Sequence, residues 1–210
     1  MTAMHKPWSL SDSYWSSLSG EHKALYALVR PQPKATYEVD VQLSHVERFL
    51  RGQAKDMMSM GGVLELEPDF QRGHVWTDEQ RVKFVESLLR GCAPRSILFN
   101  CPGWNSEQAS GDIAPHTFQC IDGLQRLTAI RKFIGGEFRV FGDLSAGQLK
   151  GSPFDPSHYT LKVSVYEFAN RVDLLQFYLD LNSGGTVHGA QELERVRQLR
   201  ELANSSVHGD

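Results

Sequence analysis

An acid, a glycine, an amide and a cation stand together in the segment IDGLQRLTAIRKF, residues 121 to 133. An apolar run ends at Asp122, and the apolar spacing typical of a helix begins two residues later. Gly123 allows the backbone to approach a ligand closely, and the first helical turn supplies N–H groups at the positive end of the helix dipole. Arg126 adds a planar fork suited to phosphate oxygens, and Gln125 can both donate and accept hydrogen bonds. These residue types at this spacing predict an anion site.

The carboxylate of Asp122 extends this chemistry, because it can hold a Mg²⁺ ion or accept a proton. We also take Thr128, one turn further along the expected helix, as a phosphate ligand. A plainer interpretation stays open. Asp122 would then only cap the helix, and Arg126 would pair with a nearby acid, because Asp-Gly before a helix is a common turn.

A second polar group lies in PDFQRGHVW, residues 68 to 76, which follows a short predicted strand in GGVLELE. Gln71 and Arg72 stand close to Trp76 in the sequence. Gln71 and Arg72 could bind a phosphate while the Trp76 ring stacks on a base. Alternatively, Trp76 anchors the loop on the core and Arg72 is solvated.

A third group is the turn LNSGGTVHGAQEL, residues 181 to 193. Asn182 lies at the end of a predicted helix, and the backbone of Gly184 and Gly185 could wrap around phosphates. Equally, the two glycines would only terminate the helix. The chain has no GxxxxGK[ST], GxGxxG, HExxH or nucleophile-elbow motif, so the familiar phosphate loops and the usual hydrolases lose support.

The apolar patterns around these groups indicate the scaffold that must position them. Thr77, with Gln80 three residues later, forms a capping box at the start of a helix that Gly91 ends. Further helices are expected at 40–52, 124–134, 171–183 and 190–205, and strands at 96–100, 117–121, 137–141 and 159–168. This mixed order predicts an α+β fold and not a doubly wound parallel sheet.

The bulk composition narrows the class of protein. With 22 basic against 25 acidic residues and a net charge of −3 over 210 residues, the chain offers no overall electrostatic case for nucleic acid, so any DNA contact must be local. The basic run RVRQLR, residues 195 to 200, is interpreted as a solvated helix face. No apolar run is long enough for a membrane span, and the three cysteines form no CxxC pair, so we expect a cytoplasmic protein without disulfides. Residues 1–36, rich in Ser, Trp and Tyr, are expected to be a leader that packs on a main domain at 37–210.

Taken in order, the segments PDFQRGHVW, IDGLQRLTAIRKF and LNSGGTVHGAQEL resemble the DGQQR domain found at the N-terminus of GmrSD-type restriction endonucleases and in related phage-defence proteins. The resemblance runs from about Pro68 to about Arg195. That family is placed with the ParB and sulfiredoxin fold, whose members bind nucleotides and hydrolyse them or move a phosphoryl group. The resemblance implies a small mixed sheet surrounded by helices. It also implies a protein of the cytoplasm, in a bacterium or in a phage-infected host cell.

The resemblance also assigns residues to the family's QR element, to its signature and to its third motif. Gln71 and Arg72 correspond to the QR element. The signature contains Asp122, Gly123, Gln125 and Arg126. The third motif contains Asn182, Gly184, Gly185 and Glu192. Leu124 replaces the first glutamine of the DGQQR signature, which removes one polar contact to nucleotide or water. The sequence, which ends at Asp210, does not contain the His and Cys pattern of an HNH-like nuclease. We therefore expect that this chain does not cut DNA itself.

Together these features predict an enzyme that uses ATP or GTP with Mg²⁺ for phosphoryl chemistry. Arg126 and Arg72 would bind the transferring phosphate, and Gln125 would orient the acceptor. Asp122 would hold the metal or accept a proton. Because the family is found in phage-defence systems that deal with modified DNA, the candidate acceptor is a hydroxymethylated base in DNA.

The alternative is a module that hydrolyses or senses NTP and docks on a separate restriction complex. Its partner surface would be the aromatic N-terminus, with Trp8, Tyr14 and Trp15.

Overall fold

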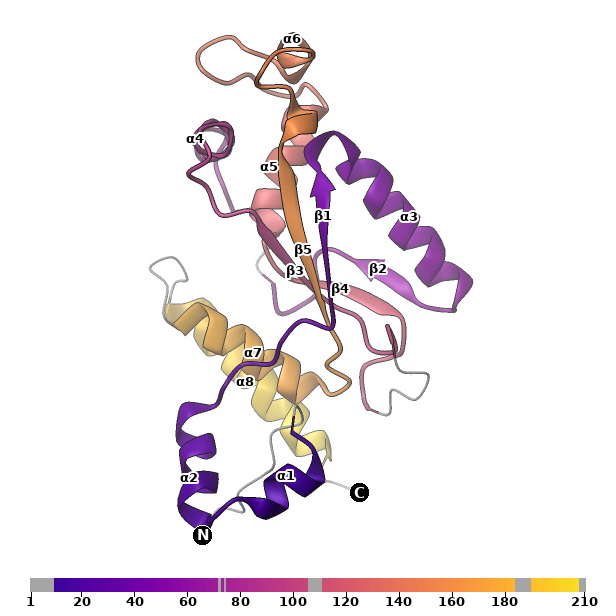
Figure 1. Ribbon diagram of the computed structural model, residues 1–210, viewed down its shortest axis with the longest axis vertical. Helices are drawn as coiled ribbons and strands as arrows, with labels where there is room; N and C mark the ends of the chain where they lie inside the picture. The colour runs from indigo at the N-terminus through magenta and orange to yellow at the C-terminus, as the bar shows by residue number, and fades with distance from the viewer. Residues whose placement is uncertain (1–9, 72, 74, 106–110, 184–189, 208–210) are drawn as a thin grey trace. The chain divides into compact units, whose positions relative to one another are not determined.

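The computed structural model describes residues 10–71, 73, 75–105, 111–183 and 190–207 (Figure 1). The chain divides into two compact units, Met1–Lys34 and Ala35–Asp210. The predicted boundary after residue 36 and the packing of the leader on the main domain stay predictions. No helix within the described ranges is both long enough and apolar enough to cross a membrane.

The first unit contains two short helices that the sequence pattern did not predict, α1 (Asp12–Ser17) and α2 (Gly20–Val29). Ser11 and Ser19 cap them, because each serine oxygen accepts a hydrogen bond from the backbone N–H three residues later. Neither helix has a buried residue, and an apolar groove of about 400 Å³ runs along them.

A five-stranded mixed sheet forms the centre of the second unit (Figure 1). Its strands are β1 (Tyr37–Gln42), β2 (Val63–Glu65), β3 (Ser96–Asn100), β4 (Thr117–Asp122) and β5 (Thr160–Tyr166). The order across the sheet is β1-β5-β3-β4-β2, in which β1/β5 and β3/β4 are antiparallel while β5/β3 and β4/β2 are parallel. The prediction of an α+β fold with a small mixed sheet is therefore confirmed.

The helices of the second unit lie on both faces of this sheet. They are α3 (Val46–Ser59), α4 (Asp78–Leu89), α5 (Leu124–Ile134), α6 (Ala146–Leu149), α7 (Arg171–Ser183) and α8 (Ala190–Val207), with 3-10 turns at Leu43–His45 and Pro156–His158. Phe99 and Phe118 belong to a core cluster built with α3, α4 and α5, whereas Ile121 packs with α7 and α8. Because side chains alternate along a strand, Cys120 and Asp122 share the α5 face at the end of β4.

Most of the expected elements are present, including the capping box of Thr77 and Gln80 at the start of α4. The helix expected at 40–52 is wrong at both ends, because residues 40–42 belong to β1 and α3 continues past Gly52. Pairing with β5 decides the first error, since cross-strand burial overrides a weak helical pattern.

The strand expected at 137–141 is also wrong. A single bridge joins Val140 to Leu144, and the chain reverses between them. Phe141 and Gly142 have φ values of 49° and 89°, a left-handed pair of residues that an extended strand does not allow.

Candidate functional site

Gly123 forms the junction between β4 and α5. It is the N-cap of α5 with φ of 97°, and a Cβ at this position would lie 2.7 Å from Ile97 Cδ1 and 3.1 Å from the Ser96 carbonyl oxygen. Both the backbone conformation and the close approach therefore require glycine. Within the described chain, no side chain caps α5 and no acid lies in its first turn, so Asp122 is not the cap of this helix.

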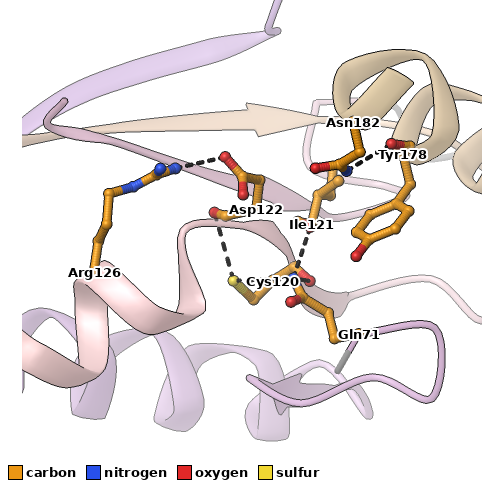
Figure 2. Close-up of polar contacts among 7 residues, drawn as sticks. All are labelled: Gln71, Cys120, Ile121, Asp122, Arg126, Tyr178 and Asn182. Carbon is orange, nitrogen blue, oxygen red and sulfur yellow. Dashed lines mark hydrogen bonds and ion pairs between the residues drawn. The ribbon is translucent and has the colours of Figure 1, made fainter. Parts of the chain in front are cut away.

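Asp122 and Arg126 form an ion pair across this first turn (Figure 2). The Arg126 Nη2 donates to the Asp122 Oδ2 at 2.5 Å, and the two side chains are 19% and 37% exposed. Pairing of Arg126 with an acid agrees with the plainer interpretation of the motif, although the acid belongs to the motif itself. The Arg126 Nε is enclosed and has no hydrogen-bond partner among the described residues, so the guanidinium keeps unused donor capacity.

Gln71 ties the first motif to the end of β4. Its Nε2 donates to the carbonyl oxygens of Cys120 at 2.9 Å and Ile121 at 2.7 Å (Figure 2). The amide nitrogen that was expected to meet a phosphate is therefore bound to the backbone. Arg72, the other half of the QR element, lies outside the described residues.

Gln125 forms a second bridge between the same two motifs. Its Nε2 donates to the Gly73 carbonyl at 2.8 Å, and its Oε1 accepts from the Trp76 backbone N–H at 3.2 Å. Residues about 50 positions apart thus form one structural unit around Gly123. The predicted role of Gln125 in orienting an acceptor stays a prediction.

Trp76 packs against Phe84 of α4, with ring centroids 5.2 Å apart, and joins the core cluster while half-buried. These contacts agree with an anchoring role, and stacking on a base stays a prediction. Thr128 is buried on α5.

The third motif begins at the end of α7, and α7 packs against the first motif through apolar side chains. Asn182, at the end of α7, is buried, and its Nδ2 donates to the Tyr178 carbonyl at 2.7 Å (Figure 2). The Tyr178 ring lies edge-on to Phe70 of the first motif, with centroids 5.5 Å apart. Gly184 and Gly185 lie outside the described residues, as does the side chain of Glu192 on α8.

The family described as the N-terminal domain of the GmrSD restriction endonuclease matches residues 55–180, which is 126 of the 210 residues. This chain belongs to the GmrSD N-terminal domain family. The predicted family is therefore confirmed. The matched residues include the first two motifs and end before the third, residues 181–193. No curated protein and no solved structure matches the chain.

Two arginines that sequence reasoning missed hold the first motif of this GmrSD-family domain. Arg171 Nη2 donates to both carboxylate oxygens of Asp69, at 2.7 and 2.6 Å. Arg195 donates from Nη1 to the Asp69 carbonyl at 2.9 Å and from Nη2 to the Gln71 carbonyl at 3.2 Å. The interpretation of residues 195–200 as a solvated face is therefore incomplete.

Cys120 lies inside the junction as a neutral thiol. Burial raises its pKa well above the ordinary value, and the negative charge of Asp122 raises it further. The Cys120 Sγ lies 3.7 Å from the Asp122 carbonyl oxygen, as its hydrogen-bond donor. A thiol in this environment is a packing residue and not a nucleophile.

Asp122 is the carboxylate available for a metal at this junction. Across the described ranges, no group of three or more His, Cys, Asp or Glu side chains is placed to hold a metal ion. Mg²⁺ is commonly held by one or two carboxylates together with substrate phosphates and water. The Mg²⁺ site at Asp122 therefore stays a prediction, and a bound polyphosphate would have to supply further ligands.

Proposed function

We infer that this GmrSD-family domain binds a nucleoside triphosphate at the β4–α5 junction, in a restriction or DNA-modification setting. The two amide bridges carry the proposal, because Gln71 and Gln125 join the first two motifs around Gly123. The restriction setting rests on the family's description, and the nucleotide rests on the chemistry of the junction.

The first turn of α5 supports phosphate binding in two ways. Its N–H groups have no side-chain cap and no competing acid within that turn, so the positive end of the helix faces the junction. Arg126 belongs to this turn and retains an enclosed Nε without a partner in the described chain.

Phosphate binding would involve an exchange of partners. A phosphate oxygen would replace the Asp122 carboxylate as the acceptor for Arg126, because a phosphate dianion can accept from both arms of the guanidinium fork. The released Asp122 would then hold Mg²⁺ or accept a proton. When bound, Mg²⁺ supplies charge neutralisation for the phosphates.

The reaction we propose is phosphoryl transfer from ATP or GTP to a hydroxyl group, with a hydroxymethylated base in DNA as the candidate acceptor. The hydroxyl oxygen forms a bond to the γ-phosphorus, the bond to the β-phosphate oxygen breaks, and NDP leaves. Asp122 takes the hydroxyl proton, and substrate phosphates and water would hold the Mg²⁺ in this step. Arg126 holds the transferring group, and Gln125 keeps the loop of residues 68–76 in place.

A second candidate function is NTP hydrolysis or NTP sensing without an acceptor. Leu124 favours it, because this residue is 3% exposed and stands where the DGQQR signature has a polar side chain. Water would then be the acceptor, or the bound nucleotide would act as a signal to a partner protein.

The test is incubation of the protein with ATP labelled at the γ-phosphate, Mg²⁺ and duplex DNA that contains hydroxymethylated bases. Label in the DNA supports transfer, and label only in free phosphate establishes hydrolysis and removes the kinase. Calorimetric binding of ATP without turnover leaves the sensing function. Absence of both ATP and GTP binding by the wild-type chain overturns the proposed function. Arg126→Ala should lose ATP binding. Lys132→Ala is the control on the same helix, and it should keep ATP binding because it removes only a surface ion pair with Glu137.

A further inference from the structure

The loop of the first motif is held by one arginine from each helix of the pair α7–α8. Arg171 is the first residue of α7, and Arg195 lies in the first half of α8. The family match ends at residue 180, before α8 begins. A segment beyond the matched region therefore contacts the backbone of a motif within it.

Arg195 fixes the path of the loop backbone. Its two arms bind carbonyl oxygens two residues apart, at Asp69 and Gln71, on either side of the fully buried Phe70. Gln71 makes its bridge to the end of β4 from this same stretch of backbone. Moving Asp69 and Gln71 would therefore move the Gln71 amide away from the Cys120 and Ile121 carbonyls.

Arg171 neutralises the Asp69 carboxylate of the loop. The Asp69 carboxylate is 60% exposed and the Arg171 side chain is 29% exposed, so the pair is partly solvated and adds little to global stability. Its electrostatic effect is local. Without Arg171, the Asp69 carboxylate would lose its ion-pair partner beside a site proposed to bind a polyanion.

We propose that Arg171 and Arg195 are positioning residues of the nucleotide site, through which α7 and α8 hold the loop of residues 68–76 in place. This inference rests on the proposed function for its ligand, a nucleoside triphosphate. The placement of the loop, in contrast, can be measured without any ligand.

The first experiment measures backbone hydrogen exchange in the full chain without nucleotide, for wild type, Arg195→Gln and Arg197→Gln. Arg197 is the matched control, because it lies on the same helix and pairs only locally with Glu194 among the described residues. Arg195→Gln should speed exchange at the amides of Phe70 and Gln71, and Arg197→Gln should leave them unchanged. Unchanged exchange in Arg195→Gln would overturn the positioning role.

The second experiment measures ATP affinity by calorimetry for the same three proteins, together with their melting temperatures. Arg195→Gln should weaken ATP binding roughly tenfold with little change in melting temperature, because a small misplacement of a binding group is costly. If wild type binds ATP and Arg195→Gln binds it equally well, the inference fails and the proposed function stands. If wild type binds neither ATP nor GTP, the proposed function fails, and the exchange experiment alone decides the positioning role.

A charge exchange separates positioning from folding. Asp69→Arg and Arg171→Asp should each speed exchange at Gln71, and the double variant should restore slow exchange by rebuilding the pair in reverse. If a single variant unfolds, restored slow exchange in the double variant still supports the inference. A folded double variant with fast exchange at Gln71 counts against it.

Discussion

Asp122 and Arg126 form a 2.5 Å ion pair within the motif that was expected to bind phosphate. The pair makes the carboxylate an internal competitor for the cation. Asp122→Asn should therefore tighten binding of ADP in the absence of Mg²⁺ by several-fold, because the neutral amide competes less well for the guanidinium. The same variant should lose phosphoryl transfer. Calorimetry with ADP checks the first result, and weaker ADP binding would show that Arg126 does not meet the phosphate.

Gln125 joins the loop of residues 68–76 to α5 through two hydrogen bonds. Gln125→Ala should lower the free energy of unfolding by about 1–2 kcal/mol, since two backbone groups lose their side-chain partner. Gln125→Glu keeps an acceptor for the Trp76 N–H, but while ionised it places a charged oxygen against the Gly73 carbonyl, so it should be at least as destabilising as Gln125→Ala. Urea denaturation measures all three proteins, and equal stability of Gln125→Ala and wild type would contradict the bridge.

Gly123 and Gly136 provide a matched pair at the two ends of α5. Both have positive φ, 97° and 79°, but only at Gly123 would a Cβ meet other atoms within 4 Å. Gly136→Ala should cost about 1 kcal/mol from backbone strain alone. Gly123→Ala should cost about 3 kcal/mol, because overpacking against Ile97 adds to the strain. Denaturation midpoints of the two variants show which one loses more stability. If Gly123→Ala loses no more than Gly136→Ala, the contact with Ile97 is easily relieved and the prediction is wrong.

The sequence was sufficient for the elements that carry the motifs, because local patterns determine them. The apolar run of β4, the glycine at position 123 and the helical spacing of α5 lie within 18 residues of one another. The capping box of Thr77 and Gln80 is likewise a local signal. Each of these features was predicted from its own residues.

The partners of the polar side chains could not be predicted in this way. The sequence marks Gln71 and Gln125 as polar residues at element boundaries, but their partners lie about 50 positions away and are backbone groups. Asp69 meets Arg171 and Arg195 across 102 and 126 positions. Only the packing of α7 and α8 against the sheet brings these residues together, and no local pattern encodes it.

Asp155 should make stability depend on pH under acidic conditions. Hydrogen bonds from the backbone N–H groups of Gly151 and Ser157 lower its pKa from 3.8 to about 2. A depressed carboxyl pKa contributes stability that is complete above the unfolded-state value and is lost as pH falls through the folded-state value. The stability difference between wild type and Asp155→Asn should therefore be constant above about pH 5 and shrink between about pH 4 and 2. Urea midpoints across this range test the sign, and a difference that grows toward low pH would contradict it.

The three cysteines should differ sharply in reactivity. Cys92 is exposed, whereas burial raises the pKa of Cys101 to about 12 and raises the pKa of Cys120 as well. Because the thiolate is the reactive species, iodoacetamide at pH 8 should label Cys92 rapidly in the folded protein and the other two only after unfolding in urea. Peptide mass spectrometry locates the label, and Cys92→Ser serves as the control that should remove the fast phase. Rapid labelling of Cys120 in the folded protein would mean that the β4–α5 junction opens readily, which is incompatible with a preformed site there.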